Sequence, residues 1–127
     1  MKEELLYQLE CYMIHMFDVA YSKIITKKVE KRMVLFPFGE VDKGSNIILY
    51  GAGKRGEIYY NQIKESGYCN VVAWIDKYKE DKVRPEKIFD FDFEKIVIAI
   101  KKPGLAEIIV NELIDMGVNK NKILWKA

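Results

Sequence analysis

The fold is decided by residues 46–56, which read Asn-Ile-Ile-Leu-Tyr-Gly-Ala-Gly-Lys-Arg-Gly. The first five form a short apolar run typical of a buried β-strand. The glycines that follow it lead into a segment with helical spacing, and a strand that passes through a glycine turn into a helix opens many parallel α/β folds. This stretch therefore predicts a sheet of parallel strands joined by crossover helices.

The rest of the chain after this stretch alternates strand and helix patterns. The expected elements are helices at 54–66 and 103–116 and strands at 71–75, 95–100 and 122–125. Residues 83–93 are too short for a full strand–helix unit, so they predict a stub strand with one helical turn from Pro85. Strands that are apolar throughout are covered on both faces. Right-handed crossovers then predict one Rossmann-like parallel sheet of order 3-2-1-4-5, with a short third strand.

Residues 1–45 have a different pattern. Apolar side chains recur at three- and four-residue steps from about residue 3 to 32, which predicts one long amphipathic helix. At about 1.5 Å per residue it would be about 45 Å long, more than one small domain can cover. Its spare apolar stripe predicts contact with a second copy of the chain, giving a homodimer, or with a partner enzyme domain. We assign residues 1–45 to this helix and a connector, and 46–127 to a nucleotide-binding α/β domain.

Composition excludes several classes of protein. The 127 residues have no room for separate cofactor and substrate domains, and 21 basic against 19 acidic residues argue against a nucleic-acid partner. No apolar run approaches the ~18 residues of a membrane-spanning helix, and no secretory signal is visible, so we expect a cytoplasmic protein. Cys11 and Cys69 form no CxxC pair, and His15 has no partner at ligand spacing. We therefore expect no disulfide framework and no metal site.

The glycines at positions 51, 53 and 56 match the GxGxxG pattern in the place where its mechanism requires it, between a strand and a helix. Gly51 permits a tight turn, Gly53 lets a pyrophosphate approach the backbone, and Gly56 lets the helix pack close to the sheet. The N–H groups of the first helical turn would form an anion site. Lys54 and Arg55 either add positive charge to it or point into solvent.

The second half of this fingerprint is an acid about 20 residues further on, at the end of the second strand. Asp76 occupies that position, and its carboxylate can accept hydrogen bonds from both ribose hydroxyls, which favours NAD over NADP. The neighbouring Lys77 weakens that preference. Lys101, after a later strand, would contact a phosphate or a substrate carboxylate, or else is solvated. On the alternative interpretation the glycines only allow a tight turn, and Asp76 caps a loop.

Five segments together resemble a known group of domains: Ile47-Ile-Leu-Tyr-Gly-Ala-Gly-Lys-Arg-Gly56, Val71-Val-Ala-Trp-Ile-Asp76, Lys95-Ile-Val-Ile-Ala-Ile100, Gly117-Val and Lys122-Ile-Leu. They resemble the small NAD(P)-binding Rossmann-like domains of bacterial surface-polysaccharide biosynthesis proteins. Examples are the N-terminal domains of CapD-like nucleotide-sugar epimerases/dehydratases and domains attached to glycosyltransferases. The resemblance covers about residues 46–125 and implies that NAD or NADP binds at Gly51, Gly53, Gly56 and Asp76. It transfers no catalytic residue, because the chemistry of that group resides in a different domain.

Three functions are consistent with these observations. The first is a non-catalytic module that binds NAD(P) or a nucleotide-sugar in surface-polysaccharide metabolism. The second is an oxidoreductase or epimerase/dehydratase component whose catalytic residues come from a partner, and the third is a structural dimerisation module with a decayed nucleotide site. An oxidoreductase needs a proton donor or acceptor near the nicotinamide. The one candidate pair, Tyr60 and Lys64 in a YxxxK pattern, lies on the first helix rather than facing that ring, so we favour the first function.

Overall fold

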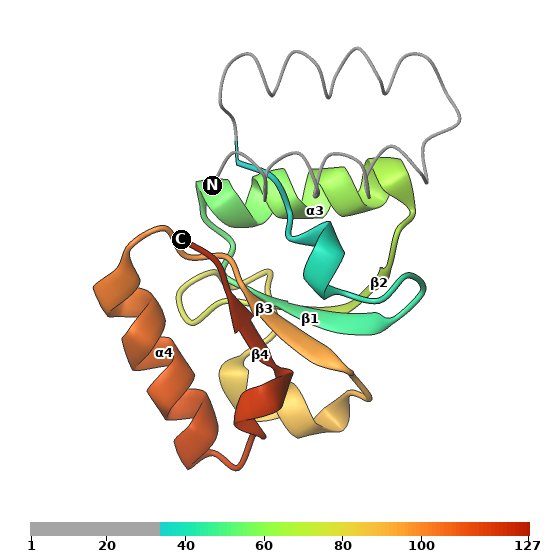
Figure 1. The fold of residues 1–127 in the computed structure, drawn as a ribbon. Coiled ribbons are helices and arrows are strands. Elements are labelled where there is room, and N and C mark those ends of the chain that lie inside the picture. The colour runs from blue at the N-terminus through green and yellow to red at the C-terminus, as the bar shows by residue number, and fades with distance from the viewer. Residues whose placement is uncertain (1–33) are drawn as a thin grey trace.

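A computed structural model of the chain describes residues 34–127 (Figure 1). The elements in chain order are η1 (Phe38–Glu40), β1 (Asn46–Tyr50), α3 (Lys54–Ser66), β2 (Asn70–Ile75), η2 (Pro85–Asp90), β3 (Lys95–Ile98), α4 (Pro103–Asp115), η3 (Lys120–Lys122) and β4 (Ile123–Trp125). The alternation of strands and helices predicted after residue 46 is confirmed. The long helix predicted at 3–32, with the dimer or partner contact expected of it, lies outside the described residues.

The strands of the described part form one parallel sheet of order β2-β1-β3-β4. The predicted third strand is reduced to a single parallel bridge between Ile75 and Val83, on the outer side of β2. It ends there because Pro85, two residues on, has no N–H with which to extend the ladder and instead begins η2. The parallel sheet and the short third segment both agree with the sequence prediction.

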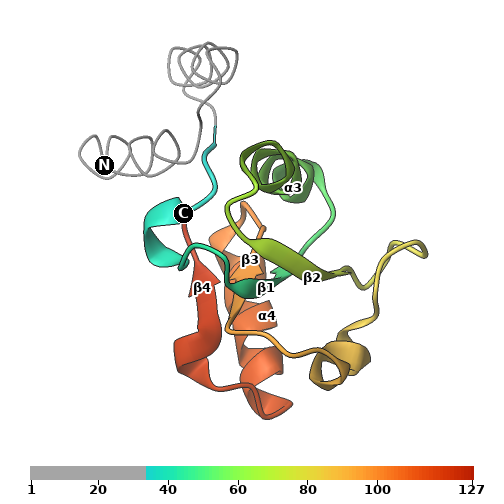
Figure 2. The same ribbon diagram turned by 90° about the vertical axis from the view of Figure 1, so that its right-hand side faces the viewer.

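The two long helices of the described part cover opposite faces of this sheet (Figures 1 and 2). α3 returns the chain from β1 to β2 on one face, and α4 returns it from β3 to β4 on the other. The direction of the crossovers therefore changes between β1 and β3. In open α/β sheets ligands bind at such a point, beyond the carboxyl ends of the strands.

The face under α3 has an aromatic core. Phe36 and Phe38 are fully buried, and the Phe36 ring meets the Tyr59 ring of α3 edge-on at 5.4 Å. Gln62 is also fully buried: its side-chain oxygen accepts from the Phe36 N–H at 2.6 Å, and its nitrogen donates to the Val34 carbonyl at 2.9 Å. Residues 34–41, which the sequence assigned to a connector, thus form part of this core.

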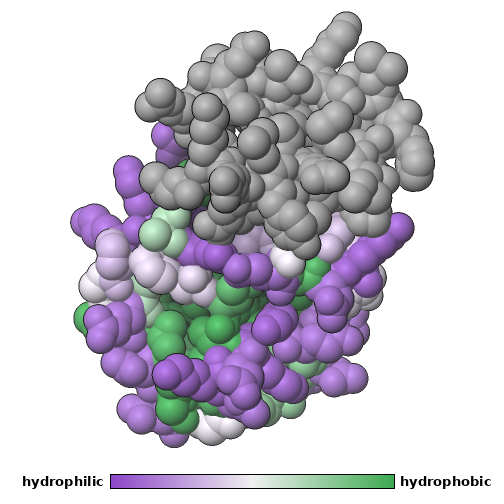
Figure 3. All heavy atoms as spheres, viewed as in Figure 1, coloured by the Kyte–Doolittle hydropathy of each residue, from purple (hydrophilic) through white to green (hydrophobic). Residues whose placement is uncertain are grey.

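The opposite face is aliphatic. Ile48 and Ile98 of the sheet pack against Ala106, Ile109 and Leu113, which recur at helical spacing along α4. At the outer strand β4 the side chains are only half-buried. In the orientation of Figure 1, apolar side chains gather at the centre of the visible face, over β3 and β4, and hydrophilic side chains surround them (Figure 3).

Candidate functional site

The loop between β1 and α3 contains the glycine motif, and packing requires two of its three glycines. Gly51 has a φ of +112°, and a Cβ there would lie 2.9 Å from the Ala99 carbonyl oxygen. A Cβ on Gly56 would lie 2.0 Å from the Gly51 carbonyl oxygen. Side chains at either position would therefore push the loop away from β3 or α3 away from the loop.

Gly53 differs from both. Its φ is −81°, and a Cβ built on it would meet nothing within 4 Å. Gly53 is the N-cap of α3, no side chain caps the helix, and the helical hydrogen bonds begin with the Glu57 N–H donating to the Gly53 carbonyl at 3.0 Å. The first N–H groups of a helix have no partner within it. Gly53 therefore leaves open space beside the start of α3.

Asp76 lies beside this loop. One carboxylate oxygen, Oδ2, accepts from the Ala52 N–H at 2.9 Å, while Oδ1 accepts from the N–H groups of Tyr78 at 2.8 Å and Lys79 at 3.1 Å. Burial acts to raise the pKa of Asp76, but these three hydrogen bonds and the Lys79 charge outweigh it and leave the pKa below its ordinary value. The carboxylate is therefore ionised at neutral pH and joins the end of β2 to the glycine loop.

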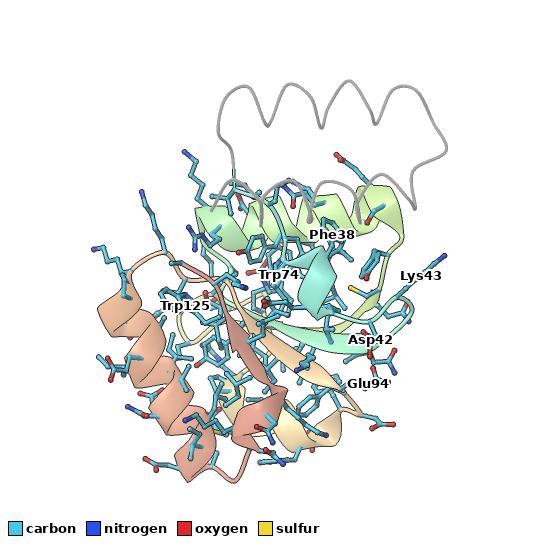
Figure 4. The ribbon with its side chains drawn as sticks, viewed as in Figure 1. Phe38, Asp42, Lys43, Trp74, Glu94 and Trp125 are labelled. Atoms are coloured by element: carbon cyan, nitrogen blue, oxygen red, sulfur yellow. The ribbon has the colours of Figure 1, made fainter. Side chains whose placement is uncertain are left out.

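Trp74 also supports the loop, and the sequence analysis did not single it out. Its indole Nε1 donates to the Gly51 carbonyl at 2.8 Å, and its ring stacks on Tyr60 of α3 with centroids 4.5 Å apart (Figure 4). The Lys82 ammonium lies 4.3 Å from the Trp74 ring centroid. The sequence did contain a signal for this role: a Trp within a predicted strand, whose indole N–H needs an acceptor when it is buried.

Of the four cations considered for the site, two are engaged by protein groups. The Arg55 guanidinium donates to the carbonyls of Lys126 at 3.1 Å and Ile100 at 3.5 Å. Lys77 forms a 2.5 Å ion pair with Glu112 of α4. The other two are exposed: Lys54 is the first residue of α3, and Lys101 lies in the β3–α4 loop, two residues before α4.

The loop after β3 is the third segment at this edge. The Ala99 N–H donates to the Tyr50 carbonyl at 2.8 Å, and the Trp125 indole donates to the Ile100 carbonyl at 2.7 Å (Figure 4). Since Arg55 also contacts the Ile100 carbonyl, this loop is tied both to α3 and to the end of β4. The segments after β1, β2 and β3 thus meet at the carboxyl edge of the sheet.

Tyr50, the last residue of β1, has an ionisable side chain that is buried in the core on the α4 face of the sheet. Burial, and then the negative charges of Glu112, Asp76 and Glu86, raise its pKa to about 12. The phenol therefore stays protonated near neutral pH and cannot serve there as a general base. Among the residues that the structure describes, no group of three or more His, Cys, Asp or Glu side chains could hold a metal ion.

A cavity of about 290 Å³ lies at the other end of α3, away from the glycine loop, and its lining includes Ile63, Gly67 and Cys69. Burial raises the pKa of the Cys69 thiol to about 12, so the thiol is not activated as a nucleophile. Both residues of the YxxxK pair border this cavity, and the Tyr60 ring also stacks on Trp74. Cys11 and His15 lie outside the described residues.

No family model matches the chain, and no curated protein matches it significantly. The resemblance to domains of polysaccharide biosynthesis therefore stays a prediction, and function is inferred from the geometry of the site. Within residues 34–127, no helix is both long enough and apolar enough to cross a membrane.

Proposed function

We propose that the glycine loop and Asp76 bind the ribose-diphosphate part of a nucleotide, with NAD as the first candidate. The observation that carries the proposal is the 2.9 Å hydrogen bond between the Ala52 N–H and the Asp76 carboxylate. This hydrogen bond holds the Asp76 carboxylate, which would bind the ribose, beside the start of α3, where the diphosphate would bind. In a nucleotide these two groups are covalently adjacent, so one ligand can contact both.

The diphosphate fits at the start of α3. Its negative charge would be stabilised by the unpaired N–H groups of the first turn and by the helix dipole. Gly53 has no Cβ to hold the phosphate oxygens away from the backbone, and the space beside it is open. The exposed Lys54 adds a cation at the same helix start.

The ribose fits at Asp76. Each carboxylate oxygen has about two acceptor positions, and Oδ2 accepts one hydrogen bond from the protein, from Ala52. Oδ2 can therefore still accept from a ribose hydroxyl. An ionised carboxylate here would repel a 2′-phosphate, and Lys77, which would oppose that repulsion, is held by Glu112. These contacts favour NAD over NADP.

In this proposal the chain is a binding module, and NAD, when bound, supplies a group that can accept or donate a hydride. The residues of the chain hold the ribose and the diphosphate and orient the ligand. Tyr50 stays protonated near neutral pH and supplies no proton acceptor. In this proposal a partner supplies the acceptor for an oxidoreductase or epimerase/dehydratase reaction. The sequence resemblance supports a place in surface-polysaccharide metabolism and makes a nucleotide-sugar the second candidate ligand.

A structural module with a decayed site is the alternative function, and two observations favour it. The Asp76 carboxylate already accepts three backbone hydrogen bonds, which is sufficient reason for an acid at that position. Arg55 and Lys77, two of the expected ligand cations, contact protein groups instead. On this alternative the glycine loop serves only the tight connection of β1 to α3.

Calorimetric titration of the full chain with NAD, NADP and a UDP-sugar distinguishes these functions. We expect saturable binding of NAD that Gly53→Ala weakens at least tenfold, because the added methyl group occupies the space the diphosphate needs. Gly104→Ala is the control, since Gly104 lies in the first turn of α4, close to a helix start as Gly53 is, and its Cβ would also meet nothing within 4 Å. Wild-type protein that binds none of these ligands would establish the structural alternative.

A further inference from the structure

Tyr78 is the most exposed of the large hydrophobic side chains in the described part of the chain. Its exposed fraction is 89%. A single exposed aromatic residue needs no explanation by itself. The position of Tyr78 does call for an explanation. Tyr78 follows Asp76 by two residues and therefore lies beside the proposed ribose site.

The backbone that carries Tyr78 is anchored at several points. The Tyr78 N–H donates to Asp76 Oδ1 at 2.8 Å, and the Lys79 N–H donates to the same oxygen. The Arg84 guanidinium also donates to the carbonyl of Lys77, the residue before Tyr78, and the Lys77 side chain pairs with Glu112. An exposed ring on an anchored backbone can stack on a ligand with little ordering of the main chain.

The Asp76 carboxylate links this ring to the proposed ligand. One of its oxygens accepts from the Tyr78 N–H, and the other is available to a ribose hydroxyl. In a nucleoside the base is attached to the carbon next to the one that bears the 2′-hydroxyl. A ribose bound at Asp76 therefore places its base within reach of the side chain two residues further along.

We propose that Tyr78 stacks on the base of the bound nucleotide, so that the site selects ligands with an aromatic base over sugar phosphates that have none. This inference rests on the proposed function and specifies its ligand class. Aromatic stacking accepts every base, because each base has a π-face. The same Tyr78 contact is therefore compatible with NAD and with a nucleotide-sugar. Contacts to other parts of the ligand would have to distinguish these two.

A second exposed aromatic residue provides the comparison. Phe89 in η2 has an exposed fraction of 59%, and its ring lies near Gly117. Gly117 follows the end of α4 and precedes β4, so it belongs to the amino edge of the sheet, opposite to the glycine loop. Phe89→Ala thus removes an exposed ring of the same kind at a distance from the proposed site.

The test is calorimetric titration of the full chain and of Tyr78→Ala, Tyr78→Phe and Phe89→Ala, with NAD and with ribose 5-phosphate as probes. We expect Tyr78→Ala to weaken NAD binding about tenfold, while Tyr78→Phe and Phe89→Ala stay within twofold of wild type. Ribose 5-phosphate, which has no base, should bind the wild type and Tyr78→Ala equally.

The outcomes separate the two proposals. If wild type binds NAD and Tyr78→Ala binds it as tightly, stacking is wrong and the proposed function stands. If Tyr78→Phe is as weak as Tyr78→Ala, the hydroxyl rather than the ring carries the contact, and stacking is again wrong. If the wild type binds neither NAD nor a UDP-sugar, the proposed function and the stacking inference both fail.

Discussion

The Asp76 carboxylate accepts a 2.9 Å hydrogen bond from the Ala52 N–H, although the two residues are 24 positions apart in the chain. Each follows the end of one of two neighbouring parallel strands, β1 and β2, whose carboxyl ends lie at the same edge of the sheet. The hydrogen bond couples the glycine loop to the segment after β2. A change at Asp76 should therefore affect both the stability of the loop and the proposed binding of a nucleotide.

Asp76 should make stability depend on pH. Its pKa in the folded state is below the ordinary 3.8, so ionised Asp76 stabilises the fold above about pH 3.8, and this contribution is lost as the pH falls towards the folded-state pKa. Asp76→Asn should lower the free energy of unfolding by roughly 1–2 kcal/mol at pH 7. The difference from wild type should shrink below about pH 4.

Urea denaturation at pH values between 7 and 3 measures this difference. Asp92→Asn, at an exposed position before β3, is the matched control and should unfold like wild type throughout. A wild-type advantage over Asp76→Asn that stays constant down to pH 3 would contradict the assigned role of the ionised carboxylate.

Gly56 and Gly53 should respond differently to substitution by alanine. Gly56→Ala should lower the free energy of unfolding by about 1–3 kcal/mol, because its Cβ would lie 2.0 Å from a backbone oxygen that cannot move without displacing the loop. Gly53→Ala should change it by no more than about 0.5 kcal/mol, since the added Cβ meets nothing. Thermal or chemical denaturation checks both, and equal losses would contradict the packing described for α3.

Gln62 should be required to hold residues 34–36 against α3. Gln62→Leu leaves the Phe36 N–H and the Val34 carbonyl without their side-chain partner, and an unsatisfied buried polar group costs about 1–3 kcal/mol. The variant should unfold at lower denaturant concentration than wild type. Asn61→Leu, at the exposed neighbouring position of the same helix, is the control, and a similar loss there would assign the effect to the surface of α3 instead.

Cys69 should react slowly with thiol reagents in the folded protein. The residue has an exposed fraction of 6%, and burial raises the pKa of its thiol to about 12, so little thiolate is present at pH 8. In a Cys11→Ser background, labelling by a disulfide reagent should be slow and should accelerate in denaturant to the rate of an unfolded thiol. Rapid labelling without denaturant would show that the cavity near Cys69 opens readily.

Local patterns were sufficient to predict most of the architecture. The apolar runs, the helical spacing and the glycine at position 51 each encode a conformation through neighbours in the chain, so the strands and helices after residue 46 could be predicted. The stub at Val83 was predictable too, because a proline follows it closely. Residues 34–41 were assigned to a connector because nothing local indicates that Phe36 and Phe38 complete the core under α3.

For the candidate site, the sequence by itself determined the kinds of groups available: a glycine loop before a helix and an acid at the end of the next strand. Only the tertiary structure decided what each group contacts. It ties Arg55 to the carbonyls of Ile100 and Lys126, pairs Lys77 with Glu112, and leaves Gly53 facing open space. The physical reason is that the backbone conformation of a turn is set by adjacent residues, whereas a long charged side chain takes the nearest partner that a distant segment brings to it.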